Sequence, residues 1–534
     1  MPRTLALTNG KIYTYEPSRP VATAVAIQGD RILTIGDDDS IRSLAGSDGE
    51  WIDLNGRCVT PGLVDAHVHF QHFSLNLQRP DLDGATSRAA ALDIVERYAN
   101  RQPAGNGWLQ GWGWSQNAWP DRAFPTAADL DRIVPDRPVY FSHKSGHAAW
   151  VNAAALRLAH IDETTPDPPG GQIQRDASGR PTGILFEDAM SLVSAHIPRP
   201  SPVEIAAAMR SAQEYCWSVG LTGIHDFDGR DCFLALQMLR ESGELGLRVV
   251  KNIPVYRLEH AIGVGLRSGF GDDWIRIGSV KIFADGALGP RTAAMIAPYE
   301  NEPENLGIVV TDKEEMLEKA RMANAAGLSM TVHAIGDRAN HDVLDVYEQL
   351  RRDEKEHNRA HFRHRIEHVQ LLHPSDVDRL AKLNVIASMQ PIHATSDMEM
   401  ADRFWGERAR LSYAWRTVRD SGAEIVFGSD APVERIDPLP GIHAAVTRRR
   451  ADGHPGEGGW YPNERLSLAE AVHGFTMAAA ITAGRERSMG SLTPGKLADL
   501  TIFDRDLFSI PFAEIPGAGI AATIVGGEFR YRTI

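Results

Sequence analysis

Nine short apolar runs constrain the fold of this chain more than any other feature of its sequence. They occupy residues 59–67, 139–142, 221–226, 247–253, 279–285, 329–333, 365–368, 385–389 and 424–430. Helical patterns lie among the later runs, at residues 314–326, 374–383 and 468–480. Apolar runs that alternate with helices are typical of βα units around a parallel sheet. We therefore predict an α/β fold with a (β/α)8 TIM-type barrel over residues 61–484, built from eight of the nine runs.

The run at 139–142 is the one that we leave out of the barrel. It lies in a stretch from about residue 75 to residue 200 that is rich in Trp, Gly and Pro and lacks the regular βα rhythm. We interpret residues 75–200 as a large insertion after barrel strand 1 that covers the active site. Its tryptophans form either the small core of the insertion or part of an apolar pocket over the site, where Trp114 is the candidate substrate contact.

The two ends of the chain share a strand-like pattern. Residues 5–15 and 22–35 alternate apolar and polar side chains, and residues 499–503 and 522–525 read as strands, the second followed by a Gly526-Gly527 turn. Ends that are both rich in strands suggest one small domain built from both of them. We predict a composite β-sandwich domain from residues 1–60 and 485–534.

Composition and charge exclude several classes of protein. The chain has 56 Lys and Arg against 70 Asp and Glu, a net charge of −14, which makes it a poor nucleic-acid binder. It contains no apolar window of about 18 residues, so we expect no transmembrane helix, and its start lacks the features of a secretory signal. The three cysteines lack CxxC spacing. This pattern favours a cytoplasmic protein that binds neither membrane nor nucleic acid.

Side chains able to bind a metal lie in or at the ends of five of the eight predicted barrel strands. Catalytic groups of such barrels lie at the carboxyl ends of the strands. The residues are His67 and His69, Lys281, His333, His368 and Asp430. Residues i and i+2 of a strand point to the same side, so His67 and His69 are able to face one ion. Neutral imidazoles with one carboxylate suit Zn²⁺.

Lys281 is a charged residue inside an apolar barrel run, and a buried cation needs a partner. One interpretation is an ion pair with Asp285 or another carboxylate. The other is a lysine carbamylated by CO₂, which removes the cation and supplies a carboxylate able to bridge two metals. The amino-acid composition does not distinguish between an ion pair and a carbamylated lysine.

Six motifs in one order resemble the amidohydrolase superfamily. They are PGLVDAHVHF, KIFADGALG, TVHAIGD, RIEHVQ, FGSDAP and the closing segment GSLTPGKLADLTIFD. Two segments of the insertion, SHKSGHAAWVNAAAL and GILFED, look like the YtcJ-like branch, which includes N-substituted formamide deformylase. The resemblance spans nearly the whole chain and is more specific for the superfamily than for a substrate.

The resemblance implies a two-metal site. His67 and His69 match the ligands of the first metal, and His333 and His368 match those of the second. Lys281 matches the lysine that bridges both metals when carbamylated, and Asp430 matches the aspartate that binds the first metal and shuttles protons. The implied cofactor is Zn²⁺, two ions per chain. The family also suggests a homodimer.

These residues predict a zinc-dependent hydrolase of an amide, N-formyl or N-acyl C–N bond. Metal-bound water has a pKa of about 7, so hydroxide is available at neutral pH. A deaminase or a hydrolase of cyclic amides or esters would use the same ligands. A non-catalytic metal-binding protein is a third class, although such a protein has no need of a proton shuttle at Asp430.

Four residues are candidate contacts to a small-molecule substrate, for which the Trp-rich insertion favours a hydrophobic or aromatic moiety. His147 contacts the substrate or forms a hydrogen bond that stabilises its loop. His225 faces the barrel mouth or supports other residues from the core. Arg291 binds a substrate carboxylate or forms a surface salt bridge. Trp114 is the fourth.

Overall fold

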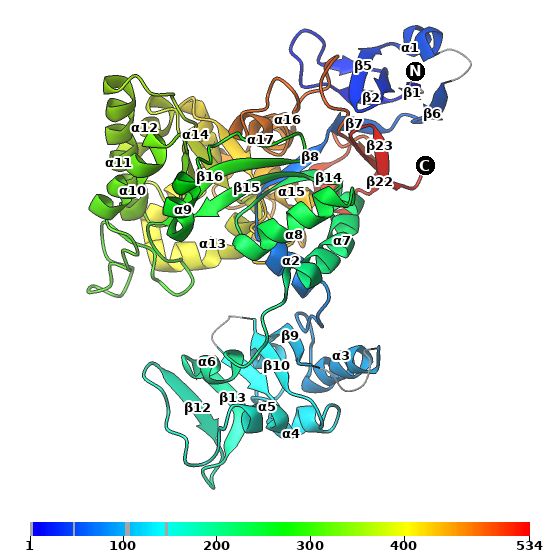
Figure 1. Cartoon of the computed structure of the whole chain (residues 1–534). Coiled ribbons are helices and arrows are strands. Elements are labelled where there is room, and N and C mark those ends of the chain that lie inside the picture. The colour runs from blue at the N-terminus through cyan, green and yellow to red at the C-terminus, as the bar shows by residue number, and fades with distance from the viewer. Residues whose placement is uncertain (1–3, 46–48, 102–106, 145–147) are drawn as a thin grey trace. The chain divides into compact units, whose positions relative to one another are not determined.

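The computed structural model describes residues 4–45, 49–101, 107–144 and 148–534 of the chain. These residues group into two compact units, one formed by residues 1–71 and 209–534 and the other by residues 72–208 (Figure 1). The first unit contains the barrel and both ends of the chain. Each unit has its own sheets and its own buried core.

Eight parallel strands form the barrel of the first unit, which confirms the predicted architecture. Each strand pairs with the next in chain order. The strands are β8 (Leu63–Val68), β14 (Leu221–Asp226), β15 (Arg248–Pro254), β16 (Ile275–Phe283), β17 (Met330–Ala334), β18 (Arg365–His368), β19 (Ile386–Met389) and β20 (Ile425–Phe427). The run that we left out is β10 (Val139–His143), which belongs to a sheet of the second unit.

The barrel closes between its first and last strands by hydrogen bonds beyond the end of β20. The amide of Asp430 donates to the carbonyl of His67 over 2.7 Å, and the amide of His69 donates to the carbonyl of Ala431 over 2.8 Å. Gly428 permits this approach. A Cβ atom at that position would lie 2.4 Å from the backbone nitrogen of His67 and 2.7 Å from Asp65 Oδ1.

Helices connect successive strands and cover the outside of the barrel (Figure 1). They are α8 (Arg230–Glu241), α9 (Leu258–Gly263), α10 (Lys313–Ala325), α11 (Asp337–Glu356), α12 (Val377–Lys382), α13 (Pro391–Trp405), α14 (Trp415–Asp420), α15 (Pro438–Thr447), α16 (Leu468–Gly474) and α17 (Met477–Thr482). Two further helices, α2 (Phe70–Asn76) and α7 (Pro202–Ser218), flank the segment that forms the second unit.

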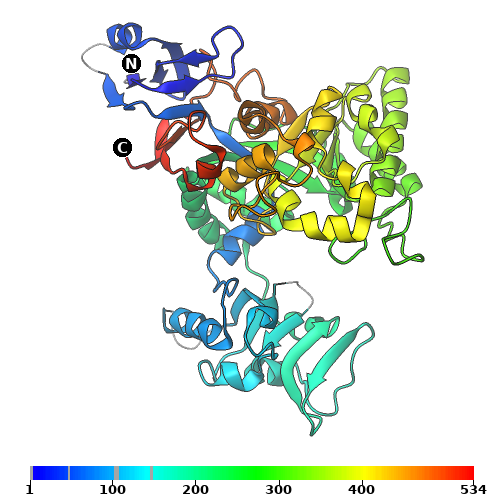
Figure 2. The ribbon, with the colours of Figure 1, turned by 180° about the vertical axis from the view of Figure 1, so that it is seen from behind.

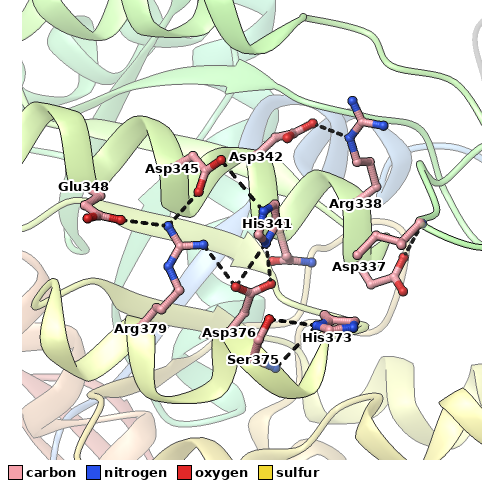
Figure 3. A network of polar contacts seen from close by, with 12 residues as sticks. Asp337, Arg338, His341, Asp342, Asp345, Glu348, His373, Ser375, Asp376 and Arg379 are labelled. Carbon is pink, nitrogen blue, oxygen red and sulfur yellow. Dashed lines mark hydrogen bonds and ion pairs between the residues drawn. The ribbon is translucent and has the colours of Figure 1, made fainter.

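A network of ion pairs joins α11 to the start of α12 (Figure 3). Asp376 is the centre of this network, since His341 Nδ1 lies 3.0 Å from Asp376 Oδ2 and Arg379 Nη1 donates to Asp376 Oδ1 over 3.0 Å. Arg379 also pairs with Asp345 at 2.7 Å. Three of these residues are buried or half-buried, and the contacts fix the two helices side by side.

Two sheets form a sandwich built from both ends of the chain, as predicted. One contains β5 (Arg31–Gly36), β4 (Ala24–Gln28), β1 (Thr4–Thr8) and β6 (Glu50–Asp53), with α1 (Asp38–Ala45) beside it. The other contains β23 (Glu528–Arg532), β22 (Ile520–Val525), β21 (Leu500–Phe503), β7 (Cys58–Pro61), β2 (Lys11–Tyr13) and β3 (Val21–Ala22). Residues of both sheets share one apolar core. The two chain ends lie in this domain in both views (Figures 1 and 2).

The second unit is built around a mixed five-stranded sheet. Its strands, in spatial order, are β12 (Gly171–Arg175), β13 (Pro181–Glu187), β11 (Ala148–Val151), β10 and β9 (Leu109–Trp114). Its helices are α3 (Arg88–Arg101), α4 (Ala127–Asp131), α5 (Ala153–Leu158) and α6 (Ala189–Ser194). Within the described part of the chain, no helix is both long and apolar enough to cross a membrane.

We predict that Gly428→Ala destabilises the barrel at its closure. The added methyl group would clash with the backbone nitrogen of His67 and with Asp65 Oδ1, and overpacking of this kind costs about 1–3 kcal/mol. Thermal unfolding followed by circular dichroism measures the effect. Gly263→Ala is the matched control, because a Cβ there contacts nothing within 4 Å. Equal melting temperatures of the two variants would contradict the closure described here.

Candidate metal centre

Five of the six predicted ligands meet at the carboxyl ends of the barrel strands. His67 Nε2 and His69 Nε2 each lie 3.5 Å from Asp430 Oδ1. The ring centroid of His368 lies 5.0 Å from that of His67 and 4.5 Å from that of His333. Ligand atoms of His67, His69 and Asp430 all lie within 4.8 Å of one another, close enough to share one ion.

Lys281 is the sixth residue, and its side chain is buried beside the same histidines. Its Nζ lies 4.8 Å from the ring centroid of Phe227, and that ring stacks on His67 with a centroid distance of 4.1 Å. The ring of Phe283 lies on another side at 4.9 Å. Burial, the largest cause, lowers the pKa of Lys281 to about 8.

Asp285 is not the partner of Lys281, although an ion pair between them was one interpretation of the sequence. The carboxylate of Asp285 instead accepts hydrogen bonds from the backbone amides of Ala294, Ile335 and Gly336, over 2.9, 3.0 and 2.8 Å. Within the described residues, the ammonium of Lys281 forms no ion pair or hydrogen bond. The carboxylates of Glu367 and Asp430 act on Lys281 through their charges alone, and each raises its pKa without outweighing burial.

Each of the four histidines uses one ring nitrogen for a hydrogen bond that orients the ring. His67 Nδ1 lies 2.6 Å from Glu367 Oε2, and His69 Nδ1 lies 3.1 Å from Asp228 Oδ1. His368 Nδ1 lies 2.8 Å from Gln390 Oε1, and His333 Nε2 lies 2.9 Å from the carbonyl oxygen of Gly286. Since these partners are acceptors, the other nitrogen of each ring keeps its lone pair. That arrangement is typical of metal-binding histidines, and the donor set fits zinc.

Burial keeps three of the four imidazoles neutral. It lowers the pKa of His67 to about 4 and that of His333 to about 3, and it holds the pKa of His368 well below its ordinary value. Burial alone would raise the pKa of Asp430, but the neighbouring His67, His393 and His69 outweigh it and lower that pKa. His69 differs from the other three, because its hydrogen bond with Asp228 and the charges of Asp430 and Asp228 outweigh burial and raise its pKa. The site combines nitrogen donors with one carboxylate, a donor set that suits a divalent metal.

The backbone at the ligands is strained. His368 has φ = 77° and Asp430 has φ = 61°, in the left-handed region that residues other than glycine adopt at a cost. Around Asp430, the carboxylate of Asp65 accepts hydrogen bonds from the amides of His67 and Ser429, each over 3.0 Å. These contacts hold the turn that presents Asp430.

Two supporting residues were missed by the sequence reasoning. Glu367 is fully buried between His67 and Arg365, and Arg365 Nη2 donates to Glu367 Oε2 over 2.9 Å. The available signal was the pair of opposite charges at positions i and i+2 of one buried strand. His393 was assigned no role, yet its Nε2 lies 3.9 Å from Asp430 Oδ2. No pattern in the sequence marks it, because it lies on a helix.

The structure places the four candidate substrate contacts in different environments. His225 is buried in the barrel, where its Nδ1 lies 3.2 Å from Arg365 Nη1. Arg291 forms an ion pair with Glu302 at 2.9 Å. Trp114 is fully buried in the core of the second unit, and its indole donates a hydrogen bond to the carbonyl of Phe141. His147 lies outside the described residues.

Comparison with known proteins agrees with this geometry. The amidohydrolase family model matches residues 50–531. The chain is 34% identical to YtcJ of Bacillus subtilis (strain 168), with 98% of each chain covered. It is 28% identical to the N-substituted formamide deformylase of Arthrobacter pascens, over 99% of this chain and 98% of that protein.

The solved structures include one that is similar over nearly the whole chain. The crystal structure of an uncharacterized metal-dependent hydrolase from Pyrococcus horikoshii OT3 matches with a TM-score of 0.80 and 27% identity. The match covers 95% of this chain and 99% of that one. The resemblance found in the sequence motifs is thereby confirmed, and the chain belongs to the amidohydrolase family, in its YtcJ-like branch.

Proposed function

We propose that this hydrolase is zinc-dependent and cleaves an amide, N-formyl or N-acyl C–N bond of a small molecule. The observation that carries the proposal is the set of four histidines, each oriented by an acceptor and gathered with Lys281 around Asp430. The printed name of the Arthrobacter pascens relative, N-substituted formamide deformylase, supports this bond type.

The six residues would hold two zinc ions. His67, His69 and Asp430 would hold the first ion, His333 and His368 the second, and carbamylated Lys281 would bridge both. When bound, zinc polarises a carbonyl oxygen and lowers the pKa of water to about 7. The positive charge of the bound ions would be balanced by Asp430 and by the carbamate.

Lys281 is prepared for carbamylation by its surroundings. The neutral amine attacks the carbon of CO₂, a nitrogen–carbon bond forms, and one N–H proton leaves to solvent. Burial favours the neutral amine, and it outweighs the charges of Glu367 and Asp430, which favour the ammonium. The product exchanges a buried cation for a carboxylate, which two metal ions would stabilise.

Asp430 performs the proton transfers. Its carboxylate accepts a proton from the attacking water and then gives that proton to the leaving nitrogen, so one residue acts as base and then as acid. An amide nitrogen leaves poorly until it is protonated, and the second transfer is therefore required. The lowered pKa of Asp430 keeps it ionised and ready for the first transfer.

A substrate panel tests the reaction type. N-acyl and N-formyl arylamines are compared with ureas, lactams and nucleobases, with the zinc-loaded protein. The proposal expects a primary amine and a carboxylic acid or formate as products, and the arylamines test whether a hydrophobic or aromatic moiety is preferred. Release of ammonia alone would indicate a deaminase, and turnover confined to lactams would indicate a cyclic amide hydrolase.

Metal removal should abolish hydrolysis. We predict that the purified protein holds two metal ions per chain, as two-metal hydrolases do. Dialysis against a chelator should remove them together with the activity, and added Zn²⁺ should restore both. Metal content by mass spectrometry and the initial rate on the best panel substrate are the measurements. A chelated protein that keeps its full rate would overturn the zinc-dependent mechanism.

Lys281→Ala should remove the bridge between the two metals. We predict loss of bound metal, loss of the carbamate signal in ¹³C NMR after incubation with ¹³CO₂, and partial rescue by short carboxylic acids that fill the vacated space. The control is Lys382→Ala, an exposed lysine whose side-chain exposed fraction is 71%. Unchanged metal content in the Lys281 variant would contradict the proposal of a bridging carbamate.

A further inference from the structure

One buried histidine beside the candidate metal centre has no assigned function. His393 is the third residue of α13, which begins directly after β19. Its side chain is 9% exposed, and its Nε2 is buried without a hydrogen-bond partner among the described residues. A buried polar atom left unpaired is costly, so such atoms in native structures call for an explanation.

The unpaired nitrogen points at Asp430 from the side opposite the first pair of histidines. His393 Nε2 lies 3.9 Å from Asp430 Oδ2, whereas His67 and His69 approach Oδ1. The ring lies nearly parallel to that of His368, at 12° and a centroid distance of 6.2 Å. Ligand atoms of His368, His393 and Asp430 all lie within 4.8 Å of one another. His393 therefore lies among the candidate metal ligands, next to Asp430 and His368.

The short segment between β19 and the start of α13 sets the position of His393. Gln390 lies between β19 and α13 and orients His368 through its Oε1, and Pro391 begins α13. Strand β19 lies between β18 and β20, which carry His368 and lead to Asp430. One short segment, residues 390–393, thus supplies both the side chain that orients a metal ligand and the one that faces Asp430.

The carboxylate of Asp430 determines which tautomer of the His393 ring is favoured. An oxygen lone pair of Asp430 at 3.9 Å repels a lone pair on Nε2 and attracts an N–H there. His393 thus offers a hydrogen-bond donor that no described residue accepts. In hydrolysis of an acyl group, the new negative charge develops on the former carbonyl oxygen, and a fixed donor aimed at that oxygen stabilises the transition state.

We propose that His393 is a catalytic residue that donates a hydrogen bond from Nε2 to the carbonyl oxygen of the substrate as that oxygen becomes an oxyanion. The proposal rests on the proposed function. In this proposal the two residues have different roles. Asp430 transfers the proton, and His393 binds the developing negative charge. The donor is preorganised, because α13 holds it before substrate arrives.

The variant His393→Phe tests this role, because phenylalanine keeps the ring and its stacking but lacks the N–H. We predict that kcat falls by about 100- to 1000-fold, the range for removal of one oxyanion donor, with a much smaller change in KM. His393→Gln, which restores an N–H donor, should recover part of the loss. The matched control His341→Gln replaces a histidine of α11 outside the barrel and should leave the rate unchanged.

Two measurements distinguish a role of His393 as an oxyanion donor from a role as a metal ligand. The metal content of His393→Phe should equal that of the wild type, and loss of a metal ion would show that His393 is a ligand instead. An N-aryl methylphosphonamidate mimics the tetrahedral transition state of N-acetyl arylamine hydrolysis. Calorimetry should show this probe binding to the zinc-loaded variant about 100-fold more weakly than to the wild type.

The binding experiment also distinguishes the two proposals. If the wild type hydrolyses none of the panel, the proposed function fails, yet the difference in probe affinity still supports a donor at His393. If wild type and His393→Phe bind the probe equally, including the case in which neither binds, the proposal for His393 is overturned whether or not hydrolysis is observed.

Discussion

A buried cluster centred on Glu367 holds the interior of the barrel and the candidate metal centre in one arrangement. Its carboxylate lies 2.6 Å from His67 Nδ1 and 2.9 Å from Arg365 Nη2. Arg365 also donates to the carbonyl of Ala66 and to Ser388 Oγ, each over 2.8 Å. The cluster therefore ties together β8, β18 and β19. Removing one partner of such a buried pair typically costs about 3–5 kcal/mol, because the other charge is left uncompensated.

The same contacts that stabilise the barrel prepare it for a metal. Glu367 fixes the His67 ring, Asp228 fixes His69, and Gln390 fixes His368, so that three lone pairs converge on the region of Asp430. Burial keeps the rings of His67 and His368 neutral, and it also disfavours the ammonium of Lys281. Together with the carboxylate of Asp430, the oriented rings form a donor set that suits a divalent metal.

Much of the fold and of the candidate site was predictable from the sequence because it depends on the periodicity of the side chains. Apolar runs separated by helices predicted the barrel, and the i, i+2 spacing of His67 and His69 followed from strand geometry. The burial of Trp114 was not predictable, since the face of a sheet that is covered depends on which helices pack on it. His393 was missed because a helical residue is placed by the docking of its helix and not by its spacing. The Lys281–Asp285 alternative stayed open because Asp285 finds its partners in backbone amides up to 51 residues away.

The central claim is that the strand ends assemble one two-metal site bridged by Lys281. Anomalous diffraction at the zinc edge, from crystals of the zinc-loaded protein, tests it most directly. The account predicts two peaks about 3.5–4 Å apart, one beside His67, His69 and Asp430 and one beside His333 and His368. Electron density should extend beyond Lys281 Nζ between them. A single peak, or two peaks with an unmodified Lys281, would contradict the account.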